Sequence, residues 1–209
     1  MLHTILPDLK SRTSRAVVGI TGRVAVGKST FADRLAEVVS QSGCTTDVLN
    51  TDGYIYPTAE LVIKNLLQCK GRFITHDVPW LLRDITTWRE SGTSQVPIYN
   101  HARYDRLDIT KKLLPTDILI VEGLLVAHPD IRHELDYLLF LETDPPELAY
   151  QWFLKRSLAI FPNQRERLEN GWRNINEITY AAETILVRDF ATSIVILDEK
   201  HEICQIIQP

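Results

Sequence analysis

Short apolar runs alternate with amphipathic segments along most of this chain. Residues 17–21 read VVGIT and residues 118–122 read ILIVE, which is typical of strands buried on both faces of a sheet. The segments between such runs carry apolar residues at helical spacing, as at Phe31, Leu35 and Val38. We therefore predict strands over 17–21, 47–51, 118–122, 137–142 and 193–197, and helices over 29–41, 60–69, 77–91, 129–135, 145–160 and 172–190.

The order of these elements predicts an α/β fold. Strands that alternate with helices form a doubly wound parallel sheet, here of about five strands, with helices on both faces. A length of 209 residues fits one domain. Within it we distinguish an N-terminal segment at 1–15, an insertion at 95–107 and a short lid at 156–172. Ligands of such sheets bind beyond the carboxyl ends of the strands.

A phosphate-binding loop follows the first predicted strand. The sequence GRVAVGKST matches the pattern G-x-x-x-x-G-K-[ST] and lies between a strand and a helix, as this motif requires. Its backbone N–H groups and the start of the helix favour an anion, Lys28 can reach the outer phosphates, and Ser29 offers a hydroxyl to Mg²⁺. The motif predicts a P-loop NTPase fold and a nucleotide site made of Gly22, Arg23, Val24, Ala25, Val26, Gly27, Lys28, Ser29 and Thr30.

Two other predicted strands end in a carboxylate. Asp52 follows the second strand, where it could accept the proton of an attacking hydroxyl and orient its oxygen, or bind Mg²⁺. The same residues also fit an Asp-Gly turn that only closes a strand. Glu122 ends the third strand and could hold Mg²⁺ directly or through water.

Two segments interrupt the regular alternation. Residues 95–107 are rich in Pro, Tyr, His and Arg, and form either a plain surface hairpin or a substrate-binding insertion. Residues 151–156 and the polar stretch after them read as a lid, in which Arg156 either neutralises the transferring phosphoryl group or lies on a solvated helix face. His101 is the better histidine for substrate contact, and we expect His133 to lie on the surface.

Composition narrows the class of protein. The formal charge of −4 and the lack of a basic stripe argue against a nucleic-acid partner. The three cysteines follow no metal or redox spacing and fit free thiols of a reducing compartment. We expect no membrane span and no secretory signal, so the expected location is cytoplasmic.

Several of these segments resemble one family. The loop is similar to that of bacterial type I pantothenate kinases, within the larger uridine kinase and phosphoribulokinase family. The resemblance implies an ATP- and Mg²⁺-dependent kinase, with Asp52 as base and with His101, Tyr104 and Asn176 contacting the acceptor. It also places Phe153 and Arg156 at the active site. The segments that carry it are 19–30, 51–57, 97–105, 118–124, 152–156 and 172–176.

The chain departs from that family's pattern at its acceptor side. Phe153 stands where the family has a tyrosine, and the stretch from Arg156 to Trp172 is shorter and has fewer aromatic residues. Asp33 stands where the family has an arginine that meets phosphates of ATP and of the inhibitor coenzyme A. These departures imply an altered acceptor pocket and weak inhibition by coenzyme A.

Three functions follow as hypotheses. The first is phosphorylation of pantothenate by ATP, and the second is the same reaction on a nucleoside or a sugar. The third is a nucleotide-dependent regulatory module with no small acceptor. The sequence leaves open a homodimer and the preference among nucleotides.

Overall fold

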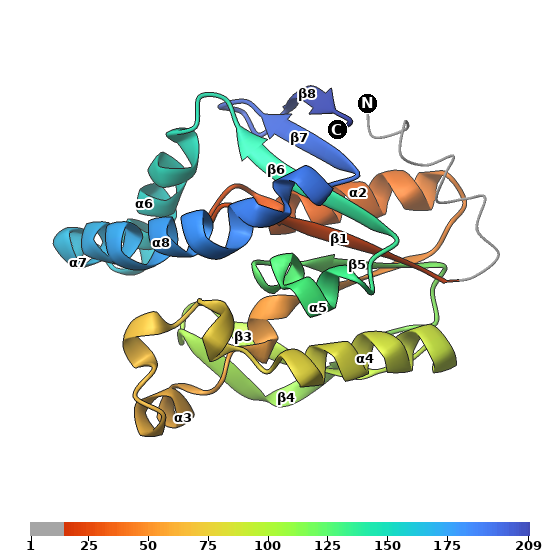
Figure 1. Cartoon of the computed structure of the whole chain (residues 1–209), viewed down its shortest axis with the longest axis horizontal. Helices are drawn as coiled ribbons and strands as arrows, with labels where there is room; N and C mark the ends of the chain where they lie inside the picture. The colour runs from red at the N-terminus through yellow and green to blue at the C-terminus, as the bar shows by residue number, and fades with distance from the viewer. Residues whose placement is uncertain (1–14) are drawn as a thin grey trace.

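The computed structural model describes residues 15–209, so most of the N-terminal segment at 1–15 lies outside the described residues. Its centre is a six-stranded sheet in the order β2-β5-β1-β6-β7-β8 (Figure 1). The first five are parallel, as predicted, and β8 runs antiparallel to β7. The strands are β1 (Ala16–Gly22), β2 (Thr46–Asn50), β5 (Ile118–Glu122), β6 (Tyr137–Thr143), β7 (Ser193–Leu197) and β8 (Ile203–Ile207).

Successive residues of the strands enter two hydrophobic cores, one on each face of the sheet. Val17 belongs to one core and Val18 to the other, as side-chain alternation along a strand requires. Helix α2 (Lys28–Gln41) covers one face with Phe31, Leu35 and Val39. Helix α4 (Val78–Ser91) covers the other face together with the short α5 (Pro129–Arg132). The predicted fold class is therefore confirmed.

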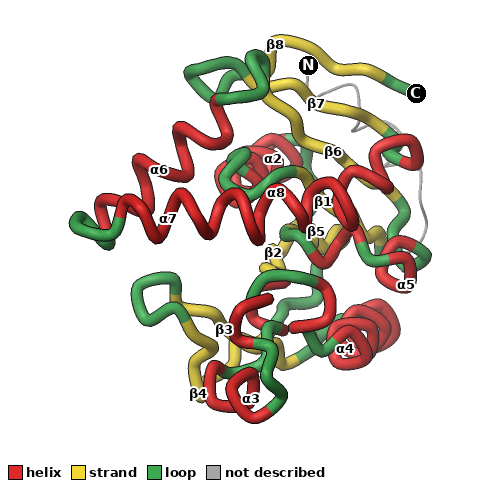
Figure 2. Tube along the Cα trace, turned by 60° about the vertical axis from the view of Figure 1, so that its left-hand side comes forward, coloured by secondary structure: helices red, strands yellow, loops and turns green. Residues whose placement is uncertain are grey.

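Residues 95–107 belong to a hairpin outside the main sheet. Strand β3 (Gln95–Asn100) pairs with β4 (Asp105–Lys112), which extends beyond the predicted insertion. Figure 2 shows this hairpin beside α3 (Thr58–Ile63). Its base packs against a 3₁₀ helix (Thr51–Tyr54), where a side chain on Gly53 would collide with the carbonyl of Pro97.

The segment predicted to be a lid, residues 156–172, lies within a pair of helices. Helix α6 (Leu148–Ile160) is followed by an irregular helical run that begins with α7 (Arg165–Gly171). In both views this pair and the β3–β4 hairpin project from the same end of the molecule (Figures 1 and 2). The run continues through a π-helical turn (Trp172–Asn176), α8 (Glu177–Thr179), a second π-helical turn (Tyr180–Thr184) and a 3₁₀ helix (Ile185–Phe190).

Several predicted boundaries were wrong for local reasons. The helix predicted over 60–69 ends at Ile63, because Asn65 adopts a left-handed conformation, and a 3₁₀ turn (Leu67–Cys69) follows. Helix α6 begins at Leu148, after two prolines. The helix predicted over 172–190 starts at Arg165, and the strand predicted to reach residue 51 ends at Asn50.

The structure also describes the cysteines and the apolar character of the helices. Cys44, Cys69 and Cys204 are free thiols. Within residues 15–209 we find no helix with the length and apolar character needed to cross a bilayer.

Candidate active site

The phosphate-binding loop joins β1 to α2 in the predicted place. Gly22, Ala25 and Gly27 have φ angles of 144°, 62° and 96°, so the loop uses left-handed backbone at both glycines. A side chain on Gly22 would collide with the carbonyl of Leu141 in β6. Lys28 Nζ lies 3.0 Å from the carbonyl oxygen of Arg23 and 3.4 Å from that of Gly22. The side chain of Lys28 thus folds back over the phosphate-binding loop.

Glu122 connects the loop to the neighbouring strand ends. Its Oε1 accepts hydrogen bonds from Ser29 Oγ at 2.8 Å and from Asn50 Nδ2 at 2.5 Å. Asn50 and Glu122 are register partners of β2 and β5, which explains why these side chains meet. Burial, and next to it the negative charge of Asp52, raise the pKa of Glu122 to about 7, although the charge of Lys28 and the hydrogen bonds from Ser29 and Asn50 act in the opposite direction. Glu122 is only 3% exposed, so this carboxyl lies inside the site.

Asp52 lies in the first turn of the 3₁₀ helix that follows β2. The backbone N–H of Asp52 donates a hydrogen bond of 2.7 Å to the side chain of Asn50, which fixes the turn. Oδ2 of Asp52 lies 3.8 Å from Nε2 of His101, which belongs to the β3–β4 hairpin. The Asp-Gly turn and the catalytic position are therefore compatible, because the turn places the carboxylate at the same sheet edge as Lys28 and Glu122.

The positive charge of Lys28 interacts with the carboxylates of Glu122 and Asp52. Burial lowers the pKa of Lys28, and the negative charges of Glu122 and Asp52 partly oppose that shift. Arg156 adds a smaller lowering effect, so this exposed arginine of α6 acts on the loop lysine across the site. The contact of Arg156 with a nucleotide stays a prediction.

The predicted acceptor residues come from the hairpin, from α6 and from the helical run after α7. His101 is 57% exposed, and its ring centroid lies 5.2 Å from that of Tyr99. Tyr104 is also exposed, with its ring 6.5 Å from that of Tyr99. Phe153 packs on Trp172 at 5.0 Å, while Asn176 is half-buried in the first π-helical turn. Their contact with an acceptor stays a prediction.

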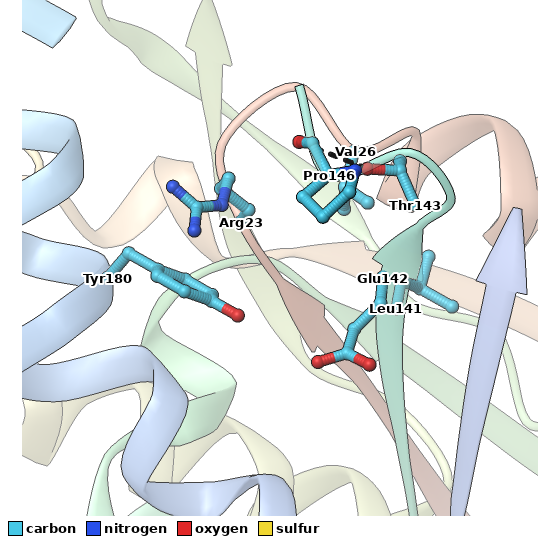
Figure 3. A pocket seen from close by; sticks show the side chains of 7 residues that line it. All are labelled: Arg23, Val26, Leu141, Glu142, Thr143, Pro146 and Tyr180. Atoms are coloured by element: carbon cyan, nitrogen blue, oxygen red, sulfur yellow. Dashed lines mark hydrogen bonds between the residues drawn. The ribbon is translucent and has the colours of Figure 1, made fainter. Parts of the chain in front are cut away.

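Sequence reasoning missed a link between the loop and the lid-side helical run. Arg23 forms an ion pair with Glu177, and its guanidinium lies 3.7 Å from the ring centroid of Tyr180. Figure 3 shows Arg23 and Tyr180 across a pocket of about 260 Å³ from Glu142. Arg188 holds Glu142 by two hydrogen bonds of 2.8 and 3.1 Å. No local motif signals these pairs, because their members are far apart in sequence.

An aromatic stack beside the loop was also missed. The rings of Trp152 and His201 lie 3.6 Å apart and nearly parallel, at 18°. A small hollow next to them is lined by Gly27, Thr30, Phe31, Arg34, Leu197 and His201. Flat side chains at the edge of a phosphate loop are suited to contact a nucleotide base.

The oxygen ligands for a metal are few but suited to Mg²⁺. Over residues 15–209 there is no cluster of three or more His, Cys, Asp or Glu side chains that could hold a metal. Mg²⁺ in kinases needs no such cluster, because one or two carboxylates and the phosphates themselves suffice. The adjacent Ser29 hydroxyl and Glu122 carboxylate fit that pattern.

Comparison with known families agrees with this geometry. Residues 17–160 match the family model described as the phosphoribulokinase / uridine kinase family. The chain belongs to this family. The matched range includes the phosphate-binding loop, Asp52, the β3–β4 hairpin and Glu122.

Curated relatives are similar over most of the chain. A pantothenate kinase of Streptococcus thermophilus is 30% identical over 78% of this chain and 56% of its own length. A pantothenate kinase of Haemophilus influenzae is 34% identical, over 76% of this chain and 54% of its own length. The chain therefore spans about half the length of the curated relatives it matches.

A solved structure agrees in fold over the whole chain. D-glycerate 3-kinase from Cryptococcus neoformans superposes with a TM-score of 0.78 at 14% identity, covering 100% of this chain and 96% of that one. At this identity the similarity concerns the fold alone.

Proposed function

We propose that this protein transfers the γ-phosphoryl group of ATP to a hydroxyl of a small acceptor, and that the acceptor is pantothenate. The observation that carries the proposal is the meeting of Lys28, Ser29, Glu122 and Asp52 at one sheet edge. The similarity to pantothenate kinases over three quarters of the chain supports the choice of acceptor.

The positions of the side chains support separate roles in binding ATP and Mg²⁺ and in phosphoryl transfer. The loop amides and Lys28 bind the β- and γ-phosphates, and the Trp152–His201 stack contacts the base. Ser29 and Glu122 hold Mg²⁺, which neutralises phosphate charge when bound. Arg156 approaches the transferred group when α6 and α7 close over the loop.

Asp52 acts as the base of the transfer. Its carboxylate accepts the proton of the acceptor hydroxyl and orients the oxygen for in-line attack. His101 sits at 3.8 Å from the same carboxylate and can contact the hydroxyl or its neighbours. Tyr104 and Asn176 bind the rest of the acceptor, while Phe153 contributes packing but no hydroxyl.

The proposal is tested by an acceptor panel. ADP release from purified protein is followed with ATP, Mg²⁺ and one acceptor at a time from pantothenate, uridine, cytidine, fructose and ribose. We expect the largest kcat/KM with pantothenate. A larger kcat/KM with a nucleoside or a sugar would support the proposed phosphoryl transfer but reject pantothenate as the acceptor. Equal ADP release with and without every acceptor would instead favour a regulatory ATPase.

A further inference from the structure

A buried lysine supports the tip of the β3–β4 hairpin. The side chain of Lys70 is only 3% exposed, although it is outside the phosphate loop and outside every motif in the sequence. Burial of an ammonium group is costly unless hydrogen bonds and charges compensate it. Its partners therefore show what the lysine holds in place.

The partners of Lys70 belong to the β3–β4 hairpin and to the first residue of helix α3. Its Nζ donates to the carbonyl oxygen of Tyr104 at 2.5 Å and to Oγ1 of Thr58 at 2.9 Å. Asp105 Oδ1 lies 3.8 Å away. The ring centroids of Tyr104 and Tyr99 lie 4.5 and 5.6 Å from the ammonium, within the range of cation–π attraction.

Asp105 extends this network to helix α3. Its two carboxylate oxygens accept from the backbone N–H of Thr58 at 3.0 and 3.2 Å, at the first turn of the helix. Lys70 and Asp105 together bind the start of α3 to the hairpin tip. Removal of the lysine would take a charged hydrogen-bond donor away from the carbonyl of Tyr104.

The tip needs such support because Tyr104 has a strained backbone. Its φ angle is 53°, a conformation that is uncommon for residues other than glycine and that persists only where neighbours hold it. The lysine binds the carbonyl of this same residue. The turn it stabilises also carries His101, which lies 3.8 Å from Asp52.

We infer that Lys70 is a positioning residue that holds His101 and Tyr104 in place for the acceptor. The contact of this tip with an acceptor rests on the proposed function, whereas its support by Lys70 does not. The side chain acts through the tip and stays away from the phosphates, so its removal changes acceptor binding more than ATP binding.

The test compares Lys70→Met with Lys64→Met. Lys64 is the matched control, because it is a lysine of the same segment whose side chain is 44% exposed and pairs only with Glu60 and the Tyr56 ring among the contacts of the described chain. Hydrogen exchange of the amides at 101–104 and the rate of tryptic cleavage after Arg103 report the tip without any acceptor. Steady-state kinetics report the KM for pantothenate and for ATP separately.

We expect tip exchange and cleavage to rise about tenfold or more in Lys70→Met, as for loss of a hydrogen bond to a charged group. The KM for pantothenate should rise by a similar factor and the KM for ATP by less than about twofold. Lys64→Met should leave all of these values near wild type. If Lys70→Met does not fold, Lys70→Gln, which keeps a donor, is measured in the same way.

Unchanged exchange and cleavage at the tip would overturn the inference. An equal rise of both KM values would also overturn it, because a general loss of structure is not specific to the acceptor. If the wild-type protein does not use pantothenate, the proposed function fails, and the exchange and cleavage rates still decide the role of Lys70.

Discussion

Replacement of Glu122 by glutamine should change how the stability of the protein depends on pH. In the folded protein without nucleotide or metal, burial and the charge of Asp52 raise the pKa of Glu122 from 4.5 to about 7. The folded state then keeps a proton that the unfolded chain releases as the pH rises above 4.5. The contribution of Glu122 to the free energy of unfolding is therefore fully present below pH 4.5 and is lost as the pH rises to about 7.

The magnitude follows from the size of the shift. A change from 4.5 to about 7 corresponds to about 3 kcal/mol between the two ends of this range. Glutamine has nearly the same shape but cannot ionise, so any packing cost of the substitution is independent of pH. The stability of Glu122→Gln relative to wild type should rise by about 3 kcal/mol between pH 4.5 and pH 8.

Urea denaturation in EDTA at several pH values between 4.5 and 8 measures this difference. Glu37→Gln, on the exposed side of α2, is the control for loss of one negative charge. Asp52→Asn should reduce the effect, because Asp52 contributes to the raised pKa. Parallel stability curves for wild type and Glu122→Gln would refute the reasoning and show that Glu122 is ionised at low cost in the folded protein.

Three further substitutions test single roles at the site. Lys28→Ala should abolish most transfer while the protein stays folded by circular dichroism; near-normal turnover would reject the nucleotide-site assignment. Asp52→Asn should lower kcat by about 10²–10⁴-fold with little change in ATP affinity, because the amide cannot accept a proton; equal loss of ATP affinity would make Asp52 a metal ligand first. The wild-type enzyme should be weakly inhibited by coenzyme A, and Asp33→Arg should strengthen inhibition by about 1–3 kcal/mol, less any screening by solvent; tight inhibition of the unmodified protein would contradict this.

The sheet could be predicted because its signal is local. Strands β1, β5, β6 and β7 are short, mostly buried apolar runs, whereas β2 alternates between half-buried and buried positions. The loop motif places β1 directly before α2. Strand β8 was missed, since this edge strand has five residues, none of them buried, and their half-buried and exposed positions do not alternate. The two π-helical turns were missed because apolar periodicity distinguishes them poorly from an α-helix.

The residues of the site also fall into those that local sequence predicts and those that only the structure shows. Lys28, Ser29, Asp52 and Glu122 occupy strand ends and the loop, so their meeting followed from topology alone. The Arg23–Glu177 pair and the support of Tyr104 by Lys70 depend on packing between distant segments. No spacing along the chain could have shown them. The structure adds the contacts that hold the tip of the β3–β4 hairpin.

Transfer of labelled phosphate tests the central claim most directly. The protein is incubated with ATP labelled in its γ-phosphoryl group, Mg²⁺ and pantothenate, and the products are separated by chromatography. The account predicts labelled phosphopantothenate in equal amount to ADP, and its loss in Asp52→Asn. Label that appears only as inorganic phosphate, or at the same rate without pantothenate, would contradict the claim that this protein is a pantothenate-phosphorylating kinase.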